Sequence, residues 1–396
     1  MRHRPTLLSQ VWGPGFQARS APGVATIPLR SSSSTCYTNP LLTDRTADQD
    51  RRFAAAFRIL EEGINQRAFP AASIAVLQND HLIALRSFGR YTYDPESPTV
   101  TSRTIFDLAS VSKVVATTTA AALLLQRGRF SLDDCVADLQ PRFGTQDIRR
   151  YDITIRQLLT HTSGLPAYVR LFEHAKTREE LLDAAYTTPL EADPDVRTEY
   201  SDIGFIILGD ILEHLAGETL DSFSQREIFD PLGLSNTRFR PIPDWHNRIV
   251  PTRDDRTFRH KIIQGEVNDE NAWVMGGVAG HAGVFSTAAE VAEFACCWLR
   301  GGTPILKPDT VAEFTRQQPG TTRALGWDRP TPPSSSGQYF SPNSFGHLGY
   351  TGTSLWIDPT RSLASVLLTN RTWPDAKNQA IKQIRPRFHD AIIEAL

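Results

Sequence analysis

The sequence predicts a mixed α/β protein of the α+β type, in which an antiparallel sheet flanked by helices adjoins a mostly helical part. Two observations carry this prediction. Strand–turn–strand patterns occur near both ends of the 396-residue chain, and the long stretch between them is dominated by helical periodicity with Gly and Pro loops. One sheet assembled from the two chain ends, with helices inserted between its halves, explains both observations.

The N-terminal elements are an amphipathic helix followed by a hairpin. The helix is expected over about 47–67, where apolar residues recur on one face: Phe53, Ala56, Phe57, Leu60 and Ile64. Pro70 ends this pattern, because proline cannot continue a helix. Two apolar runs, 72–77 and 82–85, then flank an Asn-Asp turn and predict the first pair of strands.

The C-terminal elements are a second hairpin and a final helix. Apolar runs at 354–357 and 364–368 are separated by the turn sequence Asp358-Pro359-Thr360. A helical pattern then covers Asp375 to Leu396, and we expect Pro386 to kink it. The α/β part is therefore predicted over about 46–108 and 326–396, and the helical part over about 109–325.

Residues 1–45 differ from the rest of the chain in composition. They contain several arginines and a run of four serines but no acidic residue before Asp44. A basic, Ser-rich, acid-poor segment is typical of an organellar transit peptide, and a disordered tail has a similar composition. Because the segment lacks the apolar core of a secretory signal, we expect a cytoplasmic protein, with organellar targeting as the alternative.

Composition excludes several classes of function. The chain has 42 Lys+Arg and 44 Asp+Glu, a net charge of −2, so we expect no nucleic-acid partner bound through bulk charge. No apolar run reaches the roughly eighteen residues of a membrane helix, so no transmembrane segment is expected. The four cysteines show no metal-binding or disulfide-framework spacing, so no metal is expected. The oligomeric state does not follow from the sequence.

The strongest local feature is Ser110-Val111-Ser112-Lys113, directly before the uncharged run 114–125. Such a run predicts a buried helix, with Ser110 and Lys113 together in its first turn. Capping alone would not select lysine here, because a cation opposes the positive end of the helix dipole. Burial and that dipole should instead lower the pKa of Lys113, which would let it accept the proton of the Ser110 hydroxyl.

Five further segments follow in order along the chain. They are 153–166 (ITIRQLLTHTSGLP), 200–205 (YSDIGF), 231–234 (PLGL), 283–290 (GVFSTAAE) and 346–352 (GHLGYTG). Together with the Ser-x-x-Lys segment, they resemble the serine β-lactamase and penicillin-binding-protein superfamily. The similarity is to the branch that holds class C β-lactamases, family VIII carboxylesterases and D-amino-acid-releasing peptidases, and it implies a β-lactamase/transpeptidase-like fold over about 48–395.

The resemblance implies roles for individual residues. Ser110 is the expected nucleophile, while Lys113 and Tyr200 share the proton transfers; the alternative for Tyr200 is a core aromatic. The oxyanion would be held by the N–H groups of Ser110 and Tyr350, the residue after His347-Leu348-Gly349. A second register, with 350–352 as the equivalent triplet, is the alternative.

Two positions depart from the family pattern. Asp202 stands where Asn is usual, and an ionised carboxylate cannot donate a hydrogen bond to a substrate carbonyl. Asp202 would also keep Lys113 charged, which favours Tyr200 as the base. His347 stands where class C enzymes have lysine, which weakens the positive charge there. Both departures predict weak activity on β-lactams.

Four other residues are candidates with less specific support. Asp269 and His281 lie in the polar segment 265–281, which borders the cleft in the resembled group; the alternative is a solvated loop. Arg371 follows an apolar strand and could bind a substrate carboxylate or form a surface salt bridge. His161 lies in the Leu-Thr-His-Thr-Ser-Gly segment and is expected to be structural.

The predicted function is that of a serine hydrolase that forms an acyl-enzyme on Ser110, and this function is expected to need no cofactor. The expected substrates are small esters or D-amino-acid-containing peptides and amides. A β-lactamase or a D-alanyl-D-alanine carboxypeptidase is the enzymatic alternative. A catalytically inactive binding or scaffold protein on the same fold is the non-enzymatic one, and the complete set of Ser110, Lys113 and Tyr200 argues against it.

Overall fold

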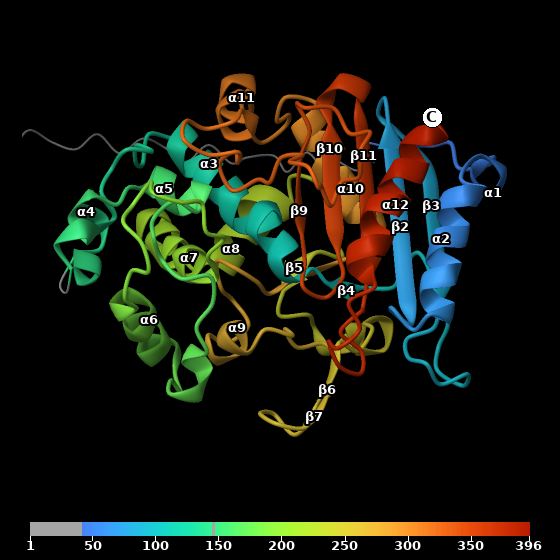
Figure 1. The fold of residues 1–396 in the computed structure, drawn as a ribbon, viewed down its shortest axis with the longest axis horizontal. Coiled ribbons are helices and arrows are strands. Elements are labelled where there is room, and N and C mark those ends of the chain that lie inside the picture. The colour runs from blue at the N-terminus through green and yellow to red at the C-terminus, as the bar shows by residue number, and fades with distance from the viewer. Residues whose placement is uncertain (1–41, 145–146) are drawn as a thin grey trace, which may run out of the picture. The chain divides into compact units, whose positions relative to one another are not determined.

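The computed structural model describes residues 42–144 and 147–396, and its main sheet joins the two ends of the chain (Figure 1). The strand order is β1-β3-β2-β11-β10-β9. β11 pairs in antiparallel register with β2 on one side and with β10 on the other, as the two hairpin patterns predict. The strands are β1 (Thr43–Asp44), β2 (Ala71–Gln78), β3 (His81–Gly89), β9 (Phe345–Leu348), β10 (Ser354–Asp358) and β11 (Leu363–Thr369).

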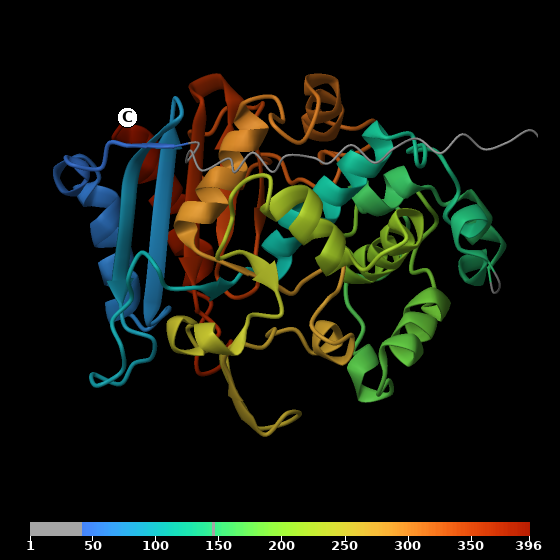
Figure 2. The ribbon, with the colours of Figure 1, turned by 180° about the vertical axis from the view of Figure 1, so that it is seen from behind.

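Helices cover both faces of this sheet. After the short α1 (Gln49–Arg52), α2 (Ala54–Asn65) packs beside α12 (Ile381–Glu394) on one face (Figure 1). α10 (Ala288–Leu299) contacts β2 and β11 from the opposite face (Figure 2). Alternate side chains of β2 enter the two cores, because successive strand residues point to opposite faces. Ile74 packs with the α2–α12 side, and Ala75 belongs to the other core.

The boundaries of the predicted parts differ from the structure in two places. α10 lies within the stretch assigned to the helical part, yet it packs on the sheet. Thr43 and Asp44 pair with His81 and Leu82 of β3, so the fold begins slightly before residue 46. Residues 1–41 of the predicted tail lie outside the described residues.

The helical part surrounds a buried central segment. This segment begins with a 3₁₀ turn (Ala109–Val111), continues as a π-helical stretch (Lys113–Thr118) and ends as α3 (Thr119–Gln126). Ala109–Gln126 is long and apolar enough to cross a membrane, but 83% of it is buried inside this protein. The other helices are α4 (Val136–Leu139), α5 (Ile155–Thr160), α6 (Arg178–Thr187), α7 (Asp202–Ala216), α8 (Leu220–Ser224), α9 (Glu270–Val274) and α11 (Pro308–Thr315).

Short strands form two smaller sheets beside the main one. β4 (Phe106–Asp107) and β5 (Arg238–Phe239) pair with the two sides of β8 (Val284–Ser286). β6 (Arg253–Asp255) and β7 (Lys261–Ile263) form a separate hairpin. The β4–β8 pairing fixes the backbone immediately before Ser110.

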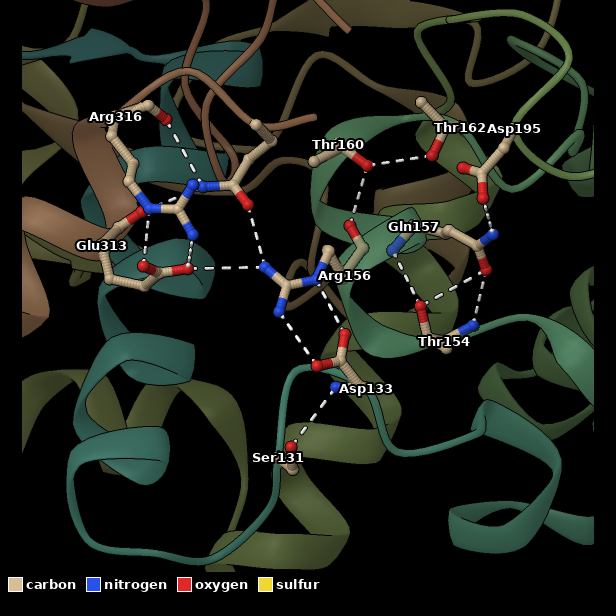
Figure 3. Close-up of polar contacts among 11 residues, drawn as sticks. Ser131, Asp133, Thr154, Arg156, Gln157, Thr160, Thr162, Asp195, Glu313 and Arg316 are labelled. Carbon is tan, nitrogen blue, oxygen red and sulfur yellow. Dashed lines mark hydrogen bonds and ion pairs between the residues drawn. The ribbon is translucent and has the colours of Figure 1, made fainter. Parts of the chain in front are cut away.

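A polar network holds α5 in place (Figure 3). Thr154 and Gln157 form a capping box at its start, which satisfies backbone N–H groups that a helix leaves free. Arg156 donates to Asp133 at 2.8 Å and to Gln318 at 2.8 Å. The helix ends at His161, whose φ of +60° is left-handed. The network therefore fixes the end of α5 and, with it, the position of His161.

Candidate active site

Ser110 follows a strained turn. Ala109 has a φ of +48°, a left-handed conformation that a residue with a side chain rarely adopts. The turn is held because Asp107 Oδ1 accepts the Ala109 N–H at 2.8 Å and Val284 O accepts the Leu108 N–H at 3.0 Å. These bonds fix the direction of the chain between the end of β4 and Ser110. Backbone strain such as that at Ala109 is typical of functional sites.

Asp107 also connects this turn to a second segment. Its Oδ2 accepts the Asn268 N–H at 2.6 Å, and its side chain is buried. Burial raises the pKa of the Asp107 carboxyl to about 6, although both N–H groups lower it. Sequence reasoning missed this residue. A lone carboxylate within the apolar run Ile105–Ala109 was the signal that could have found it.

Lys113 is buried beneath Ser110 and connects three groups. Its Nζ donates to Ser110 Oγ at 3.0 Å, to Asp202 Oδ1 at 2.6 Å and to His281 O at 3.0 Å. Burial lowers the pKa of Lys113, but Asp202 and Tyr200 outweigh burial and raise the pKa above its ordinary value. The predicted lowering of this pKa is therefore wrong, and the ion pair agrees with the expectation that Asp202 keeps Lys113 charged.

Tyr200 lies against the same pair. The Lys113 Nζ is 4.9 Å from the centre of its ring, and its hydroxyl interacts with the side chains of Lys113 and Ser110. Burial raises the pKa of the phenol, and Lys113 only partly offsets this effect. The His161 ring packs 4.7 Å from the Tyr200 ring, and His161 Nδ1 accepts the Ser201 N–H at 3.0 Å. His161 therefore positions the Tyr200 segment.

The end of β9 faces Ser110 from the sheet. His347 is buried, and burial together with Lys113 and Arg323 holds its pKa well below the usual range. Its Nδ1 donates to Leu348 O at 2.8 Å, and its buried Nε2 has no hydrogen-bond partner in the described part of the chain. Because its pKa is lowered well below the usual range, the ring supplies no fixed positive charge at neutral pH.

Gly349 brings this strand end close to the Ser110 turn. A side chain there would collide with Thr353 Oγ1 and Leu108 O. Thr353 Oγ1 donates to Leu108 O, and Thr351 Oγ1 donates to Asp107 O, each at 2.8 Å. The two threonines thus hold the backbone from Gly349 to Thr353 against residues 107 and 108. Thr351 is buried in this contact, whereas Tyr350 is exposed.

A cavity of about 820 Å³ opens in front of these groups. Nine of the predicted residues line it: Ser110, Tyr200, Asp202, Asp269, His281, His347, Gly349, Tyr350 and Arg371. Lys113 lies below the cavity floor, fully buried. The structure therefore brings all ten predicted site residues together from segments that are distant in the sequence.

The less specific candidates are also part of this arrangement. His281 Nε2 bonds Asp269 Oδ1 at 2.8 Å, and His281 is buried, so the alternative of a solvated loop is wrong. Arg371 is buried, and its Nε donates to Tyr350 O at 2.6 Å. Its guanidinium lies 4.3 Å from the centre of the Tyr350 ring, so the alternative of a surface salt bridge is wrong as well.

Comparison with known proteins identifies the family. A model of the Beta-lactamase family matches residues 56–385. The chain belongs to the β-lactamase family. A protein of Salmonella agona (strain SL483) named "Putative D-alanyl-D-alanine carboxypeptidase" is 30% identical, with 90% of this chain and 93% of that protein covered.

Solved structures share the fold of this β-lactamase-family chain. One is "EstCE1, a hydrolase with promiscuous acyltransferase activity", with a TM-score of 0.70 and 22% identity over 87% of this chain and 100% of that one. Another is a penicillin-binding-protein homologue from Caulobacter crescentus, with a TM-score of 0.70 and 19% identity over 87% and 98%. The chain is thus a serine hydrolase of the β-lactamase and penicillin-binding-protein type.

Several cavity residues of this β-lactamase-family protein were not predicted. They are Ala109, Tyr168, Arg170, Phe172, Arg253, Asn268, Glu270, Ala282, Arg323, Asp328, Leu348, Gln379, Ile381, Lys382 and Arg385. Most lie on loops or helix faces whose direction no local pattern reveals. Within 42–144 and 147–396, no group of three or more His, Cys, Asp or Glu side chains is arranged to hold a metal ion.

Proposed function

We propose that this protein hydrolyses small esters or D-amino-acid-containing peptides and amides through an acyl-enzyme on Ser110. The observation that carries the proposal is one set of contacts at the base of the cavity. Lys113 Nζ reaches Ser110 Oγ at 3.0 Å and Asp202 Oδ1 at 2.6 Å, and the Tyr200 hydroxyl interacts with the same lysine and serine. A nucleophile beside two groups that can exchange protons is the arrangement that acyl transfer requires.

The proposed reaction begins when Ser110 Oγ attacks the substrate carbonyl carbon. The hydroxyl proton passes to Tyr200 or Lys113, and the N–H groups of Ser110 and Tyr350 stabilise the oxyanion. The carbon–leaving-group bond then breaks, and the leaving group takes the proton. Water hydrolyses the ester formed on Ser110 by the same steps in reverse order and releases the acid.

Asp202 and His347 support the proposed weakness on β-lactams. Asp202 Oδ1 accepts from Lys113 and offers no donor to a substrate amide. His347 is neutral, because its pKa lies well below the usual range, so it offers no fixed charge to a β-lactam carboxylate.

A second candidate function is that of a D-alanyl-D-alanine carboxypeptidase. The name of the Salmonella agona relative favours it. Arg371 and Arg385 also favour it, because both guanidiniums are buried at the cavity and neither has a carboxylate partner among the described residues. A buried cation without an anion is costly, and the terminal carboxylate of a peptide would supply one.

A substrate panel tests the proposal. The wild-type protein and Ser110→Ala are assayed with p-nitrophenyl acetate and butyrate, with nitrocefin and with a peptide ending in D-alanyl-D-alanine. We expect kcat/KM for the esters to exceed that for nitrocefin, and Ser110→Ala to abolish all turnover. Activity that survives Ser110→Ala overturns the mechanism, and efficient nitrocefin turnover with negligible ester turnover overturns the substrate assignment. Release of D-alanine faster than ester hydrolysis favours the carboxypeptidase.

The pH profile should depend on Asp202. Both candidate bases have a raised pKa, so both hold protons at neutral pH and kcat/KM should increase as the pH rises. The Asp202 charge raises the pKa of Lys113 and of Tyr200. Asp202→Asn is therefore expected to move the increase in kcat/KM to lower pH, measured with a p-nitrophenyl ester. A shift to higher pH would contradict this account of the ion pair.

A further inference from the structure

One wall of the cavity is built from three segments that hydrogen bonds hold together. We call Tyr168, Asp202, Asn268 and Asp269 the acidic wall; all four line the cavity. The Asp202 N–H donates to Ala167 O at 2.8 Å, which places Tyr168 beside Asp202. Asn271 joins the remaining segments: its Nδ2 donates to Val169 O at 2.9 Å, and its Oδ1 accepts the Phe172 N–H at 3.0 Å. The acidic wall is therefore a fixed surface.

The charges beside this wall are not balanced. Asp202 is paired with Lys113, and the neighbouring Glu270 is paired with Arg253. Asp269 has only His281, whose Nδ1 is buried and has no hydrogen-bond partner in the described part of the chain. Within the described residues, no arginine or lysine forms an ion pair with Asp269. Burial raises the pKa of the Asp269 carboxyl, but His281, the Ala272 N–H and Lys113 together outweigh burial and lower this pKa, so Asp269 is ionised.

The wall also presents hydrogen-bond acceptors that have no donors. Asn268 is 3% exposed, and within 42–144 and 147–396 no group bonds its Oδ1. Asp269 Oδ1 accepts from the Ala272 N–H and from His281, and no hydrogen bond within the same residues engages its Oδ2. Buried acceptors are nearly always satisfied in folded proteins, so the unsatisfied Asn268 Oδ1 is exceptional. Asp269 lines the cavity, and its unengaged Oδ2 can accept a hydrogen bond from a ligand there.

The carboxylates near this wall act together on Tyr168. Burial raises the pKa of its phenol, the charges of Asp269, Glu270 and Asp202 add to this effect, and Arg170 only partly opposes them. A carboxylate with an unengaged oxygen, such as Asp269, suits a cation and repels another carboxylate. An ammonium group carries three donors and one positive charge, and it matches this wall better than a neutral amine or an alcohol does.

We propose that the acidic wall binds a free ammonium group on the acyl part of the substrate, so that the preferred substrates are aminoacyl esters or amides. This inference rests on the proposed acyl-enzyme chemistry at Ser110. The wall is close to that chemistry, because Lys113 Nζ bonds both Ser110 Oγ and the backbone oxygen of His281, the partner of Asp269. An ammonium group on the α-carbon lies next to the reacting carbonyl and needs a partner at such a position.

Matched substrates test the proposal. Alanine p-nitroanilide, N-acetylalanine p-nitroanilide and propionic acid p-nitroanilide share a leaving group, and the first two are used in both configurations. We expect kcat/KM for one configuration of alanine p-nitroanilide to exceed kcat/KM for the N-acetyl and the propionyl compounds by about ten- to a hundredfold. This is the range of a charge-assisted hydrogen bond. Asp269→Asn keeps a residue that caps α9 well, and it should remove most of this preference.

The control variant is Asp254→Asn. It makes the same change in charge on β6, at a partly exposed residue that pairs with Arg256 and does not line the cavity. We expect Asp254→Asn to keep both the preference for the free amine and the wild-type hydrolysis of p-nitrophenyl propionate. For Asp269→Asn the readout is the ratio of kcat/KM for the free amine to kcat/KM for the propionyl compound, which should fall to about one whatever happens to the absolute rates. A preference that survives Asp269→Asn, or one that Asp254→Asn removes equally, overturns the ammonium site.

A binding measurement separates this inference from the proposed function. Alaninamide and propionamide are titrated into Ser110→Ala by calorimetry, because this measurement needs no turnover. Tighter binding of alaninamide that Asp269→Asn abolishes supports the ammonium site even if no ester is hydrolysed. Equal binding of the two amides overturns the site, whereas Ser110-dependent ester hydrolysis would still support the acyl-enzyme.

Discussion

Replacing Tyr200 by Phe is expected to slow acylation of Ser110 by about a hundred- to ten-thousand-fold, the range for loss of a general acid or base. The substitution removes the hydroxyl that interacts with Ser110 and Lys113 and leaves the ring that packs on His161. The fold should therefore be retained. The measurement is the pre-steady-state release of p-nitrophenol from a p-nitrophenyl ester, with the melting temperature as the control.

The outcome also decides between the two candidate bases. Lys113 holds its proton tightly because Asp202 lies 2.6 Å from its Nζ, which favours Tyr200 as the group that takes the Ser110 proton. If Tyr200→Phe acylates at a rate close to that of the wild type, Lys113 is the base, and the ion pair must release its proton during the reaction.

Gly349→Ala is expected to reduce kcat by about a hundred- to a thousandfold, the effect of losing one oxyanion donor. The added methyl group would collide with Leu108 O and Thr353 Oγ1, so the end of β9 must move away from the Ser110 turn. Overpacking should also lower the free energy of unfolding by about 1–3 kcal/mol.

The matched control for this change is Gly204→Ala in α7. A Cβ at Gly204 would make ordinary contacts of 3.6 Å or more, so the same added methyl group has room. We expect its kcat for a p-nitrophenyl ester and its melting temperature to stay near the wild-type values. If Gly349→Ala behaves like Gly204→Ala, the close approach of β9 to Leu108 does not matter for the reaction.

The sheet could be predicted from the sequence because its hairpins and flanking helices have strong local periodicity. The layer that each helix joins could not be predicted, and α10 shows why. Periodicity reveals the apolar face of a helix but not the surface that the face meets. The C-terminal helix also begins at Ile381 rather than Asp375, because residues before it form polar contacts such as that of Asn378 with Arg67 O.

The candidate site could be predicted as a set of residues, but the electrostatics of the site could not. The local sequence around Lys113 reveals only its burial and its helix, and both of these lower its pKa. The direction of the pKa shift depends on Asp202, 89 residues further along the chain, and on the distance between the two side chains. Asp107, Tyr168 and Asn268 were missed for the same reason, since each gains its importance from contacts between distant segments.

The position of β11 in the sheet has a consequence for the order in which this protein is made. β2 is synthesised early, yet its partner β11 comes near the end of the chain, and Arg385 of α12 donates to Gly349 O at 2.7 Å. A nascent chain still attached to the ribosome therefore carries Ser110 and Lys113 without the strand end that faces them. Hydrolytic activity should begin only after β9, β11 and α12 have been synthesised, and chains that stop before residue 345 should show no ester hydrolysis.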